Sequence, residues 1–148
     1  MRLWHYQLLP YLPDAQFKGQ LRELVAIMHD WRDKGKTNHL LINRVMEYPK
    51  SEFHIYFEYY EYIYQKRYGK SLRNYLEESW DFGQGCEVLP SNGGKIFDGW
   101  HNTEYLRVCM ANLYEKHHFG IGKSRITDEE WKILLNGYKI ITGEDYMI

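Results

Sequence analysis

The strongest constraint on the fold is a helical repeat of apolar residues near the start of the chain. This stretch opens after Pro13, runs to Gly35, and places an apolar residue every three or four positions: Phe17, Leu21, Leu24, Val25, Met28 and Trp31. Such spacing puts these side chains on one side of an α-helix. Asp14 suits the amino-terminal cap, and Gly35 suits the carboxyl-terminal end. We therefore predict a helix over 14–34.

Three further stretches also favour helix. Residues 52–67 contain neither glycine nor proline, and although part of this run alternates like a strand, it is long for one. A shorter amphipathic helix is predicted over 71–80, and another over 102–116. Together with the first helix, these segments predict a mostly helical chain.

Turn and cap signals mark the remaining segments. Thr127 and Glu130 have the spacing of a capping box, which predicts a helix that ends at Gly137. Residues 1–13 contain two prolines and are predicted to be an irregular arm. Residues 81–99, which contain five glycines and a proline, are predicted to be a loop.

Length and composition fit one globular domain. The chain has 148 residues, 44% hydrophobic and 26% charged, which is ordinary for a soluble domain with one core. It has no internal repeat, low-complexity segment or long linker. We predict an all-α fold, a single-domain irregular helical bundle over 1–148.

Cellular location is inferred from what the chain lacks. Cys86 and Cys109 are too few for a disulfide framework or a cysteine-built metal site. No apolar run approaches the roughly 18 residues that span a bilayer, and the first residues do not resemble a signal peptide. We expect a cytoplasmic protein with no membrane partner.

The charge balance limits a nucleic-acid function to local patches. The net charge is −1, so the chain lacks the global positive charge typical of nucleic-acid binders. Two basic clusters remain as candidates for phosphate contacts, with solvated helix ends as the alternative. The first contains Lys116, His117, His118, Lys123 and Arg125, and the second contains Lys66, Arg67, Lys70 and Arg73.

Aromatic residues make up 17% of the chain, and 14 of them are tyrosines. A tyrosine can bury its ring while its hydroxyl stays hydrated or hydrogen-bonded. This abundance suits core packing, a wet interface or a surface on which bases stack. Composition alone leaves these alternatives open.

The first predicted helix carries a pair of charged residues on the side opposite its apolar residues. At 100° per residue, Gly19, Arg22, Glu23 and Ala26 share this face, with Ala15 close by. The small neighbours leave room for a backbone or a ligand to approach the charged pair. An ordinary solvated helix face is the alternative interpretation.

The stretch Leu12–Leu24, with its Arg-Glu-Leu triplet at 22–24, resembles the amino-terminal helix of the pyrimidine-dimer DNA glycosylase family, whose type member is phage endonuclease V. Weaker similarity continues through Gly35-Lys36 and 52–67 and returns in Ala111–Lys116. The resemblance implies a helical bundle of the endonuclease V type.

The resemblance also implies a mechanism. In this family the chain's own α-amino group attacks the sugar carbon that carries the damaged base and forms an imine, and a glutamate of the first helix assists. By this similarity Met1 and Glu23 are the candidate catalytic residues. Arg2, Arg22 and Lys116 are the candidate DNA-binding residues. Because the second residue is large, we expect Met1 to be retained.

An α-amino nucleophile is chemically reasonable. Its pKa is about 7.7–8.0, against about 10.4 for lysine, so more of it is unprotonated at neutral pH. Arg2 and Arg22 would lower this pKa further, because nearby cations disfavour a second positive charge. Glu23, partly desolvated by DNA, would move protons and stabilise the positive charge on the sugar.

We therefore predict a DNA repair glycosylase with abasic-site lyase activity, which acts on damaged double-stranded DNA without a metal or another cofactor. Trp4, Tyr6 or the tyrosine-rich helix are candidates to fill the gap left by an extruded lesion. The alternative is a non-catalytic nucleic-acid- or protein-binding relative of the same fold.

A metal-dependent hydrolase is a third possibility. His54 and Glu58 have i, i+4 spacing, and His101 and Glu104 have i, i+3 spacing, so each pair suits one helix face. No HExxH motif or cysteine pair supports a metal site. We interpret these histidines as solvated or core-edge side chains.

Overall fold

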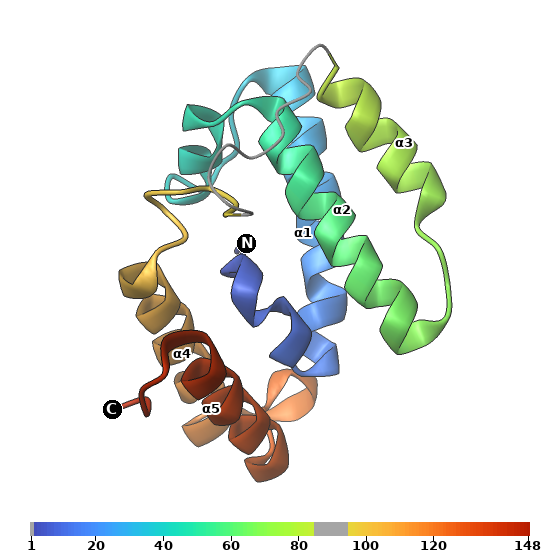
Figure 1. The fold of residues 1–148 in the computed structure, drawn as a ribbon. Helices are drawn as coiled ribbons and strands as arrows, with labels where there is room; N and C mark the ends of the chain where they lie inside the picture. The colour runs from blue at the N-terminus through green and yellow to red at the C-terminus, as the bar shows by residue number, and fades with distance from the viewer. Residues whose placement is uncertain (1, 85–94) are drawn as a thin grey trace. The chain divides into compact units, whose positions relative to one another are not determined.

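The structure is a computed structural model that describes residues 2–84 and 95–148, and within these ranges it contains helices and no strand (Figure 1). The all-α prediction is confirmed. No described helix is both long enough and apolar enough to cross a bilayer. In chain order the elements are η1 (Tyr6–Tyr11), α1 (Asp14–Lys34), η2 (Ile42–Glu47), α2 (Lys50–Tyr68), α3 (Arg73–Phe82), α4 (Thr103–His118), η3 (Gly122–Ser124) and α5 (Asp128–Thr142), where η marks a 3₁₀ helix.

The chain divides into two compact units. Unit 1 contains the segment that ends at Leu3 together with Leu21–Asp98, and unit 2 contains Trp4–Gln20 and Gly99–Ile148. Helix α1 therefore contributes residues to both units. Each unit is described by itself below, and the single domain over 1–148 stays a prediction.

Helix α1 has the predicted bounds, 14–34, but its amino-terminal cap differs. The Phe17 N–H donates to the Pro13 carbonyl at 2.9 Å, so Asp14 is the first helical residue. The predicted cap role of Asp14 is thus wrong by one position, and its carboxylate lies in the first turn, where it favours the helix dipole. Gly35 ends the helix as predicted, with φ of 72° and an N–H bond to the Trp31 carbonyl.

The core of unit 1 joins α1, α2 and α3 through aromatic rings. Trp31 of α1 packs edge-on against Phe82 of α3 at 5.1 Å between ring centroids, and Phe53 of α2 lies 6.0 Å from the same ring. Figure 1 shows α3 running beside α2. Helix α2 confirms the helix predicted over 52–67, and α3 begins two residues later than predicted and ends at Phe82.

Two side chains, one on α2 and one just before it, bind the backbone of the last residues of unit 1. The Phe97 N–H donates to the Glu52 carboxylate at 2.6 Å, and the Tyr48 hydroxyl donates to the Asp98 carbonyl, also at 2.6 Å. Phe97 is fully buried and has a left-handed backbone, with φ of 53°. The middle of the predicted loop, 85–94, lies outside the described residues.

In unit 2 the arm is more regular than predicted. Tyr6–Tyr11 forms the 3₁₀ helix η1, which contains Pro10, and the His5 Nδ1 caps it by accepting the Gln7 N–H at 3.1 Å. A short 3₁₀ helix has few internal hydrogen bonds, so the missing N–H of proline costs little there. The prediction of an irregular arm is therefore wrong over these residues.

Helix α5 contains a glycine, Gly137, inside the helix and not at its end. The capping box of Thr127 and Glu130 is present, but the helix passes Gly137 and ends at Gly143, where φ is 78°. A Cβ atom on Gly137 would lie 2.5 Å from the ring of Tyr11. Gly137 therefore permits close packing of α5 against η1, and the predicted helix end at this residue is wrong.

Candidate active site

In unit 1, helix α1 holds the start of the chain through one carboxylate. The backbone N–H of Arg2 donates to Glu23 Oε2 at 2.9 Å. These residues are 21 positions apart in the sequence, so the contact depends on tertiary folding. Because the Glu23 carboxylate is bound in this way, it faces the amino-terminal segment instead of open solvent.

The Glu23 side chain is half-buried, and burial raises the pKa of its carboxyl group. The Arg2 N–H bond and the charges of Arg2 and Arg22 lower it in part, but the net shift is upward. A carboxyl group whose pKa moves toward neutrality exchanges protons more readily at neutral pH. The environment of Glu23 therefore suits an acid–base role.

Arg22 is exposed next to Glu23 in the helix, and its charge lowers the pKa of the Glu23 carboxyl group. The small residues predicted to flank this pair differ in exposure: Ala15 is exposed, whereas Gly19 and Ala26 are half-buried. An exposed guanidinium is available to a phosphate oxygen. Met1, the predicted nucleophile, lies outside the described residues.

In unit 2, a second side chain of α1 binds the arm. The Trp4 N–H donates to Gln20 Oε1 at 2.8 Å, and Gln20 is completely buried. Trp4 is only 4% exposed, so its ring is buried, whereas Tyr6 is half-buried.

The sequence interpretation missed Gln20. Gln20 and Glu23 lie three residues apart on one helix, so both side chains project from neighbouring positions of its surface. The only sequence signal for Gln20 is a polar residue one turn before the Arg-Glu pair in an amphipathic helix. This signal does not predict that backbone N–H groups of the arm bind these side chains, because the partners are distant in sequence.

Lys116 is in unit 2, near the end of α4, and is half-buried. Its carbonyl accepts the Ile126 N–H at 3.2 Å, and the Ile126 carbonyl contacts His117 Nδ1 at 3.1 Å. These bonds hold the segment with Lys123 and Arg125 against the end of α4. The structure thus places the backbone after Arg125 beside Lys116 and His117, and His117 Nε2 also lies 3.6 Å from the Asp128 carboxylate.

The second basic cluster is partly neutralised. Arg73 forms an ion pair with Glu77 at 3.1 Å, and the Lys66 ammonium lies 4.5 Å from the ring centroid of Tyr62. Because a paired guanidinium attracts phosphate less strongly, the second cluster is the weaker candidate for DNA contacts.

Of the two histidine pairs, His54 and Glu58 share a helix, whereas His101 lies outside α4. His54 Nε2 lies 3.4 Å from Glu58 Oε2 on α2, but His101 precedes α4 and its Nδ1 accepts the Tyr6 N–H at 3.1 Å. Within 2–84 and 95–148 no three His, Cys, Asp or Glu side chains converge as ligands would.

Comparison with known proteins assigns the family. A sequence model of the pyrimidine dimer DNA glycosylase family matches residues 1–75, which is half of the chain and includes η1, α1, η2 and α2. The chain belongs to the pyrimidine dimer DNA glycosylase family. Searches of curated proteins and of solved structures found no match. The matched residues include Arg2, Arg22 and Glu23, whereas Lys116 lies beyond them.

Proposed function

We propose that this protein is a DNA glycosylase with abasic-site lyase activity, and that its α-amino group is the nucleophile. The hydrogen bond from the Arg2 N–H to Glu23 supports this proposal most directly. The α-amino group of Met1 is only three covalent bonds from that nitrogen. Anchoring residue 2 to Glu23 therefore limits how far the amine can be from the carboxylate.

The chemistry begins when the unprotonated amine attacks C1′ of the damaged nucleotide. The bond between C1′ and the base breaks, the base leaves with a proton, and opening of the sugar gives an imine between the amine and C1′. Loss of a C2′ proton then expels the 3′ phosphate by β-elimination, and water releases the protein from the imine. Glu23 is the proposed acid–base group for these proton transfers.

DNA binding is proposed to depend on Arg2, Arg22 and Lys116. The exposed guanidinium of Arg22 is adjacent to the proposed base, so a phosphate bound there would bring the sugar toward Glu23. Lys116 lies with Lys123 and Arg125 in the basic cluster of unit 2. Such contacts give affinity and position without sequence specificity.

Borohydride trapping tests the proposal. The protein is incubated with a duplex that contains one abasic site, borohydride reduces any imine, and the covalent adduct is resolved by electrophoresis. We expect an adduct whose protease digest places the DNA on the amino-terminal peptide, and intact-mass measurement identifies the first residue of the purified chain.

The matched control is reductive methylation of the α-amino group to a tertiary amine, which cannot form an imine. We expect the methylated protein to bind the duplex and to give no adduct. A folded, unmodified protein that binds the duplex without trapping would contradict the lyase proposal and would support a non-catalytic DNA-binding relative.

A further inference from the structure

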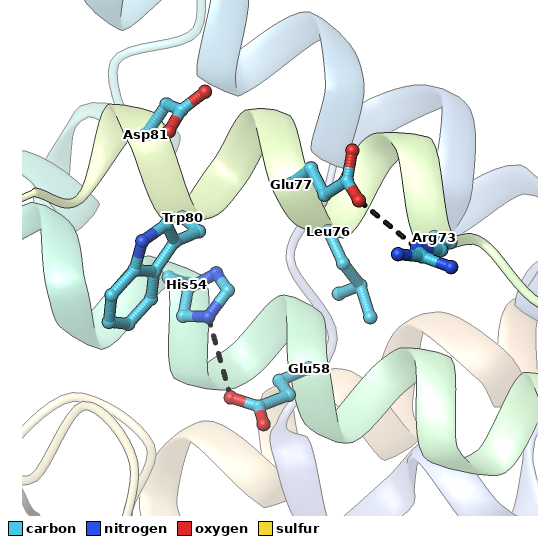
Figure 2. A pocket seen from close by; sticks show the side chains of 7 residues that line it. All are labelled: His54, Glu58, Arg73, Leu76, Glu77, Trp80 and Asp81. Atoms are coloured by element: carbon cyan, nitrogen blue, oxygen red, sulfur yellow. Dashed lines mark hydrogen bonds and ion pairs between the residues drawn. The ribbon is translucent and has the colours of Figure 1, made fainter.

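Unit 1 contains a groove between α2 and α3, on helices that the proposed chemistry does not use. It has a volume of about 460 Å³. Figure 2 shows Trp80, His54 and Glu58 gathered at one end, the Arg73–Glu77 pair at the other, and Leu76 between them. The residues that line it are His54, Glu58, Arg73, Leu76, Glu77, Trp80 and Asp81.

The groove is negatively charged. It contains three carboxylates, those of Glu58, Glu77 and Asp81, against one guanidinium, and this guanidinium already pairs with Glu77 at 3.1 Å. Burial lowers the pKa of His54, and the charge of Glu58 offsets this only in part, so the imidazole is mainly neutral at pH 7. A phosphate backbone would be repelled here, whereas a cation would be attracted.

An exposed indole accompanies these carboxylates. Trp80 is 52% exposed, and its ring packs edge-on against His54 at 5.5 Å. His54 is held in turn by a 2.6 Å hydrogen bond between its Nδ1 and the buried Ser79 hydroxyl. The indole is therefore supported on one side and open on another. A cation over an open indole gains electrostatic energy from the ring, and more beside a carboxylate.

The dimensions of the groove suit a long side chain on a peptide. Its α3 wall runs from Arg73 to Asp81, about 12 Å along the helix axis, which matches about four residues of extended peptide. Leu76 and Trp80 offer apolar surface to a methylene stem, and Figure 2 shows the Glu58 carboxylate on the same side of α3 as the indole, where it can bind the charged head. A bare metal ion would use neither apolar surface.

We propose that this groove binds a lysine or arginine side chain of a protein partner, with the cation between the Trp80 indole and the carboxylate of Glu58. The negative charge of the groove favours a cationic partner. The apolar surface of Leu76 and Trp80 favours a cation that is carried on a long aliphatic stem. This inference is independent of the catalytic proposal, because none of these residues takes part in the proposed chemistry.

The test follows the indole N–H resonance of Trp80 in ¹⁵N-labelled protein, assigned with Trp80→Phe. Acetyl-Gly-Lys-Lys-Gly-amide is titrated in at low salt, with the corresponding Glu-Glu peptide, spermidine and a short DNA duplex as separate probes. We expect a saturable shift with the lysine peptide, weaker binding of spermidine, and no response to the acidic peptide or the duplex.

Variants identify the groups that bind. Trp80→Ala and Glu58→Gln should each weaken peptide binding by about two- to fivefold, as expected for one cation–π or exposed charge contact. For the variant without the Trp80 indole, binding is followed by calorimetry. Tyr75→Ala, on the same helix but outside the groove, and Glu104→Gln are matched controls that should bind normally.

Four results would overturn the inference. They are the absence of a saturable shift, an equal response to the acidic peptide or the duplex, binding of spermidine as tight as that of the peptide, and a Trp80 resonance that moves with protein concentration alone. The third would assign the groove to a free polyamine, and the fourth to a second copy of this chain. Thermal melts confirm that each variant is folded.

Discussion

Two carboxylates of unit 1 make the same kind of contact in different surroundings. Glu23 accepts the Arg2 N–H at 2.9 Å, and Glu52 accepts the Phe97 N–H at 2.6 Å. Burial raises the pKa of both carboxyl groups. The neighbouring charges differ, however, because arginines lie near Glu23, whereas Asp98 lies near Glu52 and raises its pKa further.

The difference separates a proposed chemical role from an architectural one. Positive neighbours keep part of the Glu23 population ionised despite burial and also attract DNA phosphates. Glu52 has a negative neighbour and holds a buried ring in place. A backbone N–H bound to a half-buried glutamate is therefore not by itself a mark of an active site, and the surrounding charge is the more informative feature.

The largest expected effect separates the two carboxyl groups by activity. Glu23→Gln should lower the rate of strand cleavage at an abasic site by about 10²–10⁴-fold, the usual contribution of a general acid–base group. Single-turnover cleavage of a labelled duplex gives the rate. Glu52→Gln, which keeps the size and the acceptor oxygen, should cleave within about threefold of the original protein, and equal losses in both variants would remove the distinction.

The next effect concerns how the arm is held. Gln20→Leu leaves the buried Trp4 N–H without its acceptor, which should cost about 1–3 kcal/mol of unfolding free energy. Urea denaturation monitored by circular dichroism measures this loss. Asn74→Leu, at an exposed position of α3, is the control and should change stability by less than about 0.5 kcal/mol. An unchanged Gln20→Leu midpoint would contradict the anchoring role.

Stability should also depend on pH at both sites. A carboxyl group whose folded pKa is raised binds more protons in the folded state, so its contribution to stability is greatest at low pH and decreases as pH rises above about 4.5. Glu23→Gln and Glu52→Gln should each reduce this decrease when melting is measured from pH 4 to 8. If the difference in melting temperature between the wild type and each variant did not change with pH, the raised pKa values of Glu23 and Glu52 would be contradicted.

His5 makes an opposite contribution to the pH dependence of stability. Burial lowers the pKa of His5 to about 4, so its neutral form favours folding above about pH 6.5 and stability is lost as pH falls toward 4. Because His5 is present in every variant, comparison at each pH removes its effect. His5→Gln should itself reduce the loss on the acid side.

The smallest effect concerns the charges near Glu23. Arg22→Gln should weaken binding to duplexes of any sequence and reduce the slope of log affinity against log salt concentration by about one. It should also move the pH–rate profile toward alkaline pH, since Arg22 lowers the Glu23 pKa. Arg44→Gln, on η2, is the control, and equal slopes for Arg22→Gln and the original protein would contradict a phosphate contact.

Local signals predicted α1 well because its bounds depend on neighbouring residues. The spacing of its apolar residues predicts which face is buried, and Gly35 predicts where the helix ends. The orientation of Glu23 toward Arg2 was not predictable in this way, because 21 residues separate them and only the folded arm brings them together. Gly137 shows the converse: the residue suits a helix end, but its partner Tyr11, distant in sequence, makes it a packing position.

The left-handed backbone of Phe97 has a consequence for how this protein can vary. Glycine would suit φ of 53° best, yet it would remove a ring that is entirely buried. Another large side chain would keep the packing but retain the backbone strain. No single substitution improves both the packing and the backbone conformation at this position. Substitution of Phe97 should therefore be tolerated only together with substitutions of the residues around it.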